Sequence, residues 1–104
     1  MTTQNYVAGI DAGTTGTTVM IADLQGGVVG SAYREYPCKY PHPGWVEQDM
    51  EHMWRQICAA SQEVLHKTGC DPQTIKSLGF SSQRGTFVCV DQDIHPLADS
   101  IVWS

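Results

Sequence analysis

Asp11 is the residue whose type and position most strongly suggest chemistry in this chain. It stands at the end of an apolar segment, and the turn that follows it contains Gly13, Thr14 and Thr15. Glycine lets the backbone bend sharply and turn its N–H groups inward, and the two threonines add hydroxyl donors. A carboxylate faces a cation directly or through water, while N–H and O–H donors face an anion. The run therefore suits a metal ion paired with a phosphate group.

The same run also fits an ordinary β-hairpin with a polar turn, where Thr and Gly are common. A simple hairpin, however, does not require an acidic residue at the end of an apolar strand. The run is not a P-loop, because the Gly-Lys-Ser/Thr ending is absent. It is not a dinucleotide-binding fingerprint either, because a strand rather than a helix follows. The metal–phosphate site and the plain turn both stay open at this point.

The composition describes a folded, acidic chain. Its 104 residues are 41% hydrophobic and 16% charged, which is typical of one soluble domain. The net charge of −5, with only 6 Lys plus Arg, argues against nucleic-acid binding, which needs a basic face. No apolar run approaches the ~18 residues of a membrane span, and the N-terminus lacks a secretory-signal pattern. The 4 cysteines are scattered without a C-x-x-C pair, so we expect reduced thiols and a cytoplasmic protein.

Three apolar segments precede the first proline-rich stretch and predict strands separated by short glycine-containing turns: 6–11, 18–23 and 27–36. Strands joined by such short turns are antiparallel neighbours. The segment 37–48 contains prolines and a glycine that exclude regular structure, so it is predicted to be a loop. Trp45 and Val46 are its apolar residues and are expected to pin it to the body of the domain.

The clearest helix is predicted over residues 49–68. Asp49 is a suitable N-cap, and Gly69 is a suitable stop. One mostly apolar stripe, expected to be core, consists of Met50, Met53, Trp54, Ile57, Ser61, Val64, Leu65 and Thr68.

Three more strands are predicted after the helix: 75–82, 86–90 and 98–103. The first follows a strand and a helix, which indicates a crossover connection. The segment 91–96 reads as the turn that joins the last two strands into a short ribbon. The expected architecture is therefore an α/β fold with the order β-β-β-α-β, followed by a β-ribbon.

This order, with an Asp-Ala-Gly-Thr-Thr run between the first two strands, resembles the ribonuclease H-like ATPase fold of actin, sugar kinases and chaperone ATPases. Three further motifs make the chain similar to the FGGY carbohydrate kinases, the family of glycerol, xylulose and ribulose kinases. These motifs are the Tyr-Pro-His-Pro-Gly-Trp-Val-Glu-Gln-Asp run at 40–49, the Gly-Phe-Ser-Ser-Gln-Arg-Gly-Thr run at 79–86, and the segment 96–104. The resemblance covers essentially the whole chain.

The resemblance implies ATP-dependent phosphorylation of a sugar or polyol hydroxyl. Asp11 would hold Mg²⁺ through water, and Gly13, Thr14 and Thr15 would contact the terminal phosphates of ATP. Phosphoryl transfer depends on charge neutralisation and in-line positioning more than on covalent chemistry.

On the substrate side, the resemblance implies that Gln83, Arg84 and Trp103 contact the sugar. An arginine fork can donate two parallel hydrogen bonds to neighbouring hydroxyls, and an aromatic ring suits the apolar face of a sugar. The alternatives without a substrate role are a surface arginine at a strand end for Arg84 and core packing for Trp103.

Two departures from the glycerol kinases bear on the substrate. Glycerol kinases carry Glu directly after the substrate arginine, where this chain has Gly85, and they carry Arg at the position of Thr18. Both differences favour a larger acceptor, such as a ketose or a sugar acid. The Met-His-Gly signature typical of xylulose kinases is also absent.

The family's general base is an Asp far downstream, so it and the adenosine pocket are expected beyond Ser104. Residues 1–104 would then be the N-terminal part of the first kinase domain, incomplete at its C-terminus and inactive alone, while the full-length protein is expected to be a homo-oligomer. The alternatives are a non-catalytic phosphate-binding or interaction module of the same fold, and another ATPase of the wider fold. The 40–49 motif and the Ser-Gln-Arg strand end speak against the latter.

Overall fold

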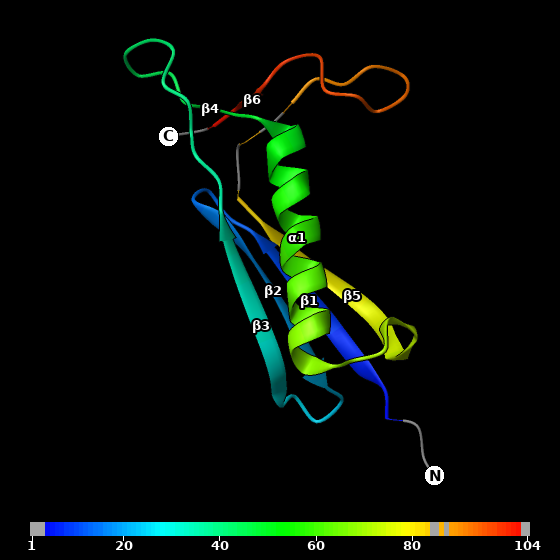
Figure 1. The fold of residues 1–104 in the computed structure, drawn as a ribbon. Helices are drawn as coiled ribbons and strands as arrows, with labels where there is room; N and C mark the ends of the chain where they lie inside the picture. Colours follow the sequence, from blue (N-terminus) through cyan, green and yellow to red (C-terminus); the bar gives the residue numbers. More distant parts are fainter. Residues whose placement is uncertain (1–3, 84–85, 87, 103–104) are drawn as a thin grey trace.

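The computed structural model describes residues 4–83, 86 and 88–102. A four-stranded sheet carries one long helix on one face (Figure 1). The elements in chain order are β1 (Tyr6–Ala12), β2 (Gly16–Asp23), β3 (Val28–Glu35), β4 (Glu47–Gln48), α1 (Met50–Thr68), the 3₁₀ turn η1 (Pro72–Thr74), β5 (Ile75–Ser82) and β6 (Ser100–Ile101).

The sheet has the strand order β3-β2-β1-β5. Strand β2 pairs antiparallel with both β1 and β3, as the short turns predict. Strand β5 pairs parallel with β1, which confirms the predicted crossover through α1. The β-β-β-α-β order of the sequence analysis is therefore confirmed.

Helix α1 begins and ends as predicted. The Asp49 side chain accepts hydrogen bonds from the backbone N–H groups of Glu51 and His52. Gly69 adopts the left-handed conformation with φ 68° and donates to the carbonyl of Leu65, which ends the helix. The core lies between α1 and the sheet, and its helical members are Met53, Ile57, Ala60 and Val64.

Trp54 does not belong to this core, which corrects the predicted stripe. Its side chain is 59% exposed, whereas Ala60, absent from that stripe, is fully buried. The N-terminal turns of α1 project past the sheet (Figure 1). Trp54 there faces the segment 88–96 instead, and together with Val88 and Ile94 it lines a shallow hollow.

The predicted C-terminal ribbon is also wrong. Residues 86 and 88–89 form no strand, and Val90 makes only an isolated bridge with Pro96 across the 91–95 turn. The expected strand 98–103 shortens to β6, and β6 pairs with β4, inside the segment predicted to be a loop. The prolines restrict their own positions and the residues just before them, so the backbone after Gly44 is free to pair. Lys39 and Glu47 exchange two backbone hydrogen bonds of 2.6 and 2.9 Å there.

Trp45 does not pin the predicted 37–48 loop to the body, contrary to the prediction. It is exposed, and its ring packs edge-on against His42 with ring centroids 4.4 Å apart. Val46 does hold the segment, but through its backbone carbonyl, which accepts from the Val102 N–H at 2.9 Å.

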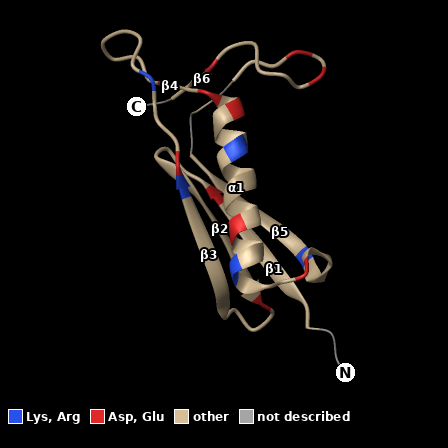
Figure 2. Cartoon of the chain, in the orientation of Figure 1, with Lys and Arg blue, Asp and Glu red and all other residues tan. Residues whose placement is uncertain are grey.

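Charges are dispersed over the fold. Figure 2 shows Lys and Arg spread over β3, α1 and the connecting segments, with acidic residues between them. Among the described residues, no helix is both long and apolar enough to cross a membrane.

Candidate functional site

Asp11 lies on the face of the sheet that α1 leaves uncovered. It stands opposite Thr18 on β2 and Ser81 on β5. Neighbouring strand residues in register share a face of the sheet, so these three side chains point to the same side. They line a hollow of about 290 Å³, whose floor includes Gly9 and Gly79. An exposed carboxylate therefore borders a concave surface with two hydroxyls beside it.

Hydrogen bonds within the turn and from Tyr36 hold the turn after Asp11 in a tight conformation. The Gly13 N–H donates to the carbonyl of Gly16 at 3.0 Å. The buried hydroxyl of Tyr36 shares its one hydrogen between the carbonyls of Gly13 and Gly16. Burial raises the pKa of Tyr36 to about 12, and the negative charge of Asp11 acts in the same direction. Tyr36 therefore stays a neutral donor, and the turn is firmly positioned.

Gly16 allows this close approach. A Cβ at this position would lie 2.5 Å from the Tyr33 hydroxyl oxygen and 2.6 Å from the Arg34 carbonyl oxygen. Such distances are shorter than real contacts, so a side chain here would push β3 away from the turn. No role for Gly16 was predicted from the sequence, and its position inside the Gly-Thr-Thr-Gly run was the only signal.

The turn also contacts the end of β5 through side chains. The Thr14 hydroxyl donates to the Gln83 side-chain carbonyl at 3.0 Å. The Gln83 backbone N–H donates to the Ala12 carbonyl at 3.2 Å. The residue predicted for phosphate and one predicted for sugar therefore touch directly, at the end of the sheet where β4 and β6 also lie (Figure 1).

Gln48 completes this contact from the 40–49 motif. Its side-chain N–H donates to the Thr14 carbonyl at 2.6 Å, and its side-chain carbonyl accepts from Gln83 at 2.8 Å. The 40–49 motif contributes to the family resemblance, but no role for Gln48 was predicted from it. Only the side-chain hydrogen bonds to Thr14 and Gln83, residues 34 and 35 positions away, reveal that role.

Five of the seven predicted site residues lie in the described part of the chain and at one end of the sheet: Asp11, Gly13, Thr14, Thr15 and Gln83. Arg84 and Trp103 lie outside the described residues. The predicted Mg²⁺ role of Asp11, the phosphate roles of the turn and the sugar role of Gln83 stay predictions.

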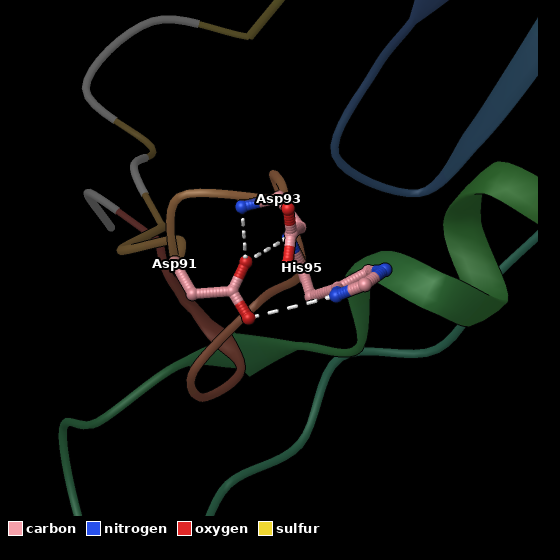
Figure 3. A group of neighbouring side chains, drawn as sticks. All are labelled: Asp91, Asp93 and His95. Carbon is pink, nitrogen blue, oxygen red and sulfur yellow. Dashed lines mark hydrogen bonds and ion pairs between the residues drawn. The ribbon is translucent and has the colours of Figure 1, made fainter.

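A second group of ionisable side chains lies in the 91–95 turn, away from this site. Asp91, Asp93 and His95 could each offer a ligand atom, and all three are exposed (Figure 3). The Asp91 carboxylate already accepts from the backbone N–H groups of Asp93 and His95 at 2.9 Å each. These bonds explain the cluster as the closure of a turn.

The fold and the site both lead to one family. Residues 6–104 match the N-terminal domain of the FGGY family of carbohydrate kinases, and the chain belongs to that family, as its motifs indicated. A glycerol kinase of Synechocystis is 41% identical over 99 residues, which are 94% of this chain and 20% of that protein. A glycerol kinase of Acaryochloris marina is 38% identical over 104 residues, covering 99% of this chain and 21% of that protein.

Solved structures agree. A xylulose kinase from Brucella ovis superposes with a TM-score of 0.88 at 27% identity, covering 95% of this chain and 20% of that one. The Plasmodium falciparum glycerol kinase, solved with ADP, superposes with a TM-score of 0.84 at 25% identity, covering 96% of this chain and 20% of that one. These neighbours confirm the ribonuclease H-like fold. The chain spans about a fifth of the length of the relatives it matches.

Proposed function

We propose that this chain is the N-terminal segment of an ATP-dependent kinase that transfers the γ-phosphoryl group to a carbohydrate hydroxyl. The observation that carries this proposal is the direct hydrogen bond between Thr14 of the phosphate turn and Gln83 at the end of β5. Transfer requires donor and acceptor to meet in line, and this contact brings the two predicted binding elements together.

The residues present fit a magnesium–nucleotide pair. Asp11 offers an exposed carboxylate at the rim of the hollow, and oxygen is the ligand that Mg²⁺ prefers. Gly13 to Thr15 form a turn that leaves the Thr15 side chain exposed beside it. When bound, ATP and Mg²⁺ supply the phosphoryl group and neutralise its charge; the turn orients the phosphates, and Asp11 positions the cation.

We propose a ketose or a sugar acid as the acceptor. Thr18 stands opposite Asp11, where glycerol kinases carry the longer Arg, and the shorter side chain contributes to the open hollow. Gly85 likewise has no side chain at the position where glycerol kinases carry a Glu carboxylate. A polyol such as glycerol is the second candidate, because the Synechocystis relative, at 41% identity, is named a glycerol kinase.

The general base and the adenosine pocket are proposed to lie in the longer protein that carries this segment. Residues 1–104 alone then bind without catalysing transfer. We further propose that the complete kinase is a cytoplasmic homo-oligomer that binds neither nucleic acid nor membranes. A coupled assay of the 104-residue chain with ATP, Mg²⁺ and a panel of sugars checks the first point, because turnover would show that no further catalytic group is needed.

The experiment that tests the function is the same coupled assay on the complete kinase, with glycerol, ketopentoses, ketohexoses and sugar acids. Transfer to a ketose or sugar acid supports the first candidate, and a clear preference for glycerol supports the second. The Asp11→Asn variant should lower kcat through lost Mg²⁺ handling, and Arg84→Ala should mainly raise the sugar KM. Absence of transfer to any acceptor would instead favour a non-catalytic phosphate-binding module.

A further inference from the structure

Gln48 lies where three segments with predicted ligand contacts converge. Its side chain is 1% exposed. Its amide touches Thr14 of the phosphate turn and Gln83 at the end of β5. Its backbone carbonyl accepts from the buried Ser100 hydroxyl at 3.2 Å, on β6, the strand that leads to Trp103. Gln48 itself points into the protein and is not exposed toward the hollow beside Asp11.

The hydrogen bonds among Thr14, Gln48 and Gln83 close into a ring. The carbonyl oxygen of Thr14 determines which group donates and which accepts in each of these bonds. The Thr14 carbonyl can only accept, so the Gln48 amide must turn its N–H toward it. The Gln48 carbonyl then faces Gln83, which must turn its own N–H inward. The Gln83 carbonyl consequently faces the Thr14 hydroxyl, which is obliged to donate. Reversing either amide would place two acceptors against each other.

This polarity has a consequence for ligand binding. The Thr14 hydroxyl has one hydrogen, and the ring directs it to Gln83. A phosphate oxygen that draws this hydrogen away leaves the Gln83 carbonyl without its donor. That carbonyl is then free to accept from a hydroxyl of the sugar. Occupation of the phosphate turn therefore prepares the acceptor side.

We propose that Gln48 is a positioning residue that couples the phosphate turn to the acceptor end of β5. The proposal rests on the proposed kinase function, since it concerns how the two ligands of that reaction affect each other. Gln48 acts through Thr14 and Gln83, and it makes the exchange possible by holding both in one ring. The buried amide has partners on both of its ends, so replacing it removes two bonds to two different predicted sites at once.

The test uses the complete kinase and separates coupling from packing. Gln48→Met keeps the length of the side chain and removes both ring bonds, together with the longer bond from the Gln48 amide to the Cys38 Sγ at 3.4 Å. We expect the KM for ATP and the KM for the sugar each to rise by about tenfold, the effect of one lost hydrogen bond of ordinary strength. Gln56→Met is the matched control, because Gln56 also donates to a backbone carbonyl, that of Glu35, at 2.7 Å, but lies outside the ring. Both KM values of this control should stay within about twofold of wild type, as expected for an exposed amide.

A double-mutant cycle sharpens the result. Gln83→Met should change the KM for ATP as well as raise that for the sugar, although Gln83 is predicted to contact only the sugar. The Gln48→Met/Gln83→Met double variant should have KM values no higher than those of the single variant with the higher KM values, because either substitution alone already breaks the ring. Additive effects on both KM values would show that the two residues act separately and would overturn the coupling.

Other outcomes are also decisive. If the Gln48→Met enzyme is less abundant but both of its KM values are unchanged, Gln48 acts only in packing. That result would refute the proposal. If Gln48→Met does not fold, Thr14→Val keeps the buried Gln48–Gln83 pair and removes only the hydroxyl. Because the Gln83 carbonyl then has no Thr14 donor in any state, the sugar KM should no longer depend on the ATP concentration, and a dependence equal to that of wild type would overturn the coupling. Wild-type enzyme without activity on any acceptor would refute the proposed function itself, a result distinct from these.

Discussion

Strands β2 and β5 have equal lengths and differ sharply in burial. Both contain eight residues. In β2, Thr17, Val19 and Ile21 are almost fully buried, whereas in β5 Leu78 is 51% exposed and Phe80 is 66% exposed. Strand β2 lies between β1 and β3 under α1, while β5 is the edge strand that α1 does not cover. Apolar residues alone therefore do not create a core, because burial requires a neighbour on each side.

The two strands also differ in what they position. The end of β2 holds the turn after Asp11 firmly, through Gly16 and the Tyr36 hydroxyl. The end of β5 is held by the Gln83 contacts to Ala12, Thr14 and Gln48. The phosphate turn is thus supported by packing, and the predicted sugar side is supported by a polar ring. The following predictions test this contrast.

The largest effect is expected from truncating matched apolar residues on the two strands. Ile21→Ala should lower the free energy of unfolding by about 2–5 kcal/mol, because it leaves a cavity under α1. Leu78→Ala should change it by about 0.5 kcal/mol or less in the 104-residue chain. Urea unfolding of both variants measures the difference. In a longer kinase whose further elements cover β5, the Leu78 loss should grow toward the Ile21 value, and equal small losses in both chains would contradict this.

A smaller effect is expected from adding a methyl group to matched glycines. Gly16→Ala places Cβ against the Tyr33 hydroxyl and the Arg34 carbonyl and should cost about 1–3 kcal/mol. Gly79→Ala is the control on β5, where a Cβ meets nothing within 4 Å in the described structure. Urea unfolding again compares the two. A Gly79 loss as large as that of Gly16 would show that the open face is covered.

Tyr36→Phe should cost about 1 kcal/mol, because the carbonyls of Gly13 and Gly16 lose a buried donor. Tyr33→Phe is the matched control, since the Tyr33 ring is half exposed on β3. Thermal unfolding of the two variants measures the difference. If both variants melt alike, the Tyr36 hydroxyl does not support the turn.

The pH dependence of stability offers an independent check on Tyr36. Its pKa is raised in the folded state to about 12 from an ordinary value of 10.0, so the folded state holds the proton more tightly. The associated stability is complete below pH 10 and is lost as pH rises toward about 12. Tyr36→Phe should remove this loss from the unfolding free energy measured across that range.

The smallest effect is expected from exposed charges. The Arg34 side chain on β3 pairs with Glu63 on α1 at 2.9 Å, with 41% and 38% of the two side chains exposed. Arg34→Met should therefore cost less than about 1 kcal/mol, and the cost should shrink as salt is added. Lys76→Met on β5 removes only a hydrogen bond to the Gln73 carbonyl and should show no such salt dependence. Salt titrations of urea unfolding distinguish them.

Much of the fold could be predicted because its signals are local. The three hairpin-linked strands and the Asp49 and Gly69 helix boundaries each depend on residues within a few positions, and the crossover to β5 follows from the order strand, helix, strand. The β4–β6 pair could not be predicted, because it joins residues about fifty positions apart and each strand has two residues. The exposure of Trp54 also depends on where α1 extends past the sheet.

The site divides in the same way. The Asp11 carboxylate and the Gly-Thr-Thr turn are adjacent in the chain, so their chemistry can be predicted without a structure. Tyr36 and Gln48 contact that turn from distant segments, and neither lies at a spacing that predicts the contact.

The sequence by itself determined the residue types at the turn, the strand and helix pattern and, through its motifs, the family. Only the tertiary structure decided which of those residues meet. It placed Asp11 beside Thr18 and Ser81 on the uncovered face and closed Thr14, Gln48 and Gln83 into one ring. The physical reason is that hydrogen bonds act over about 3 Å, whereas the residues that make these bonds are 34 to 69 positions apart in the chain.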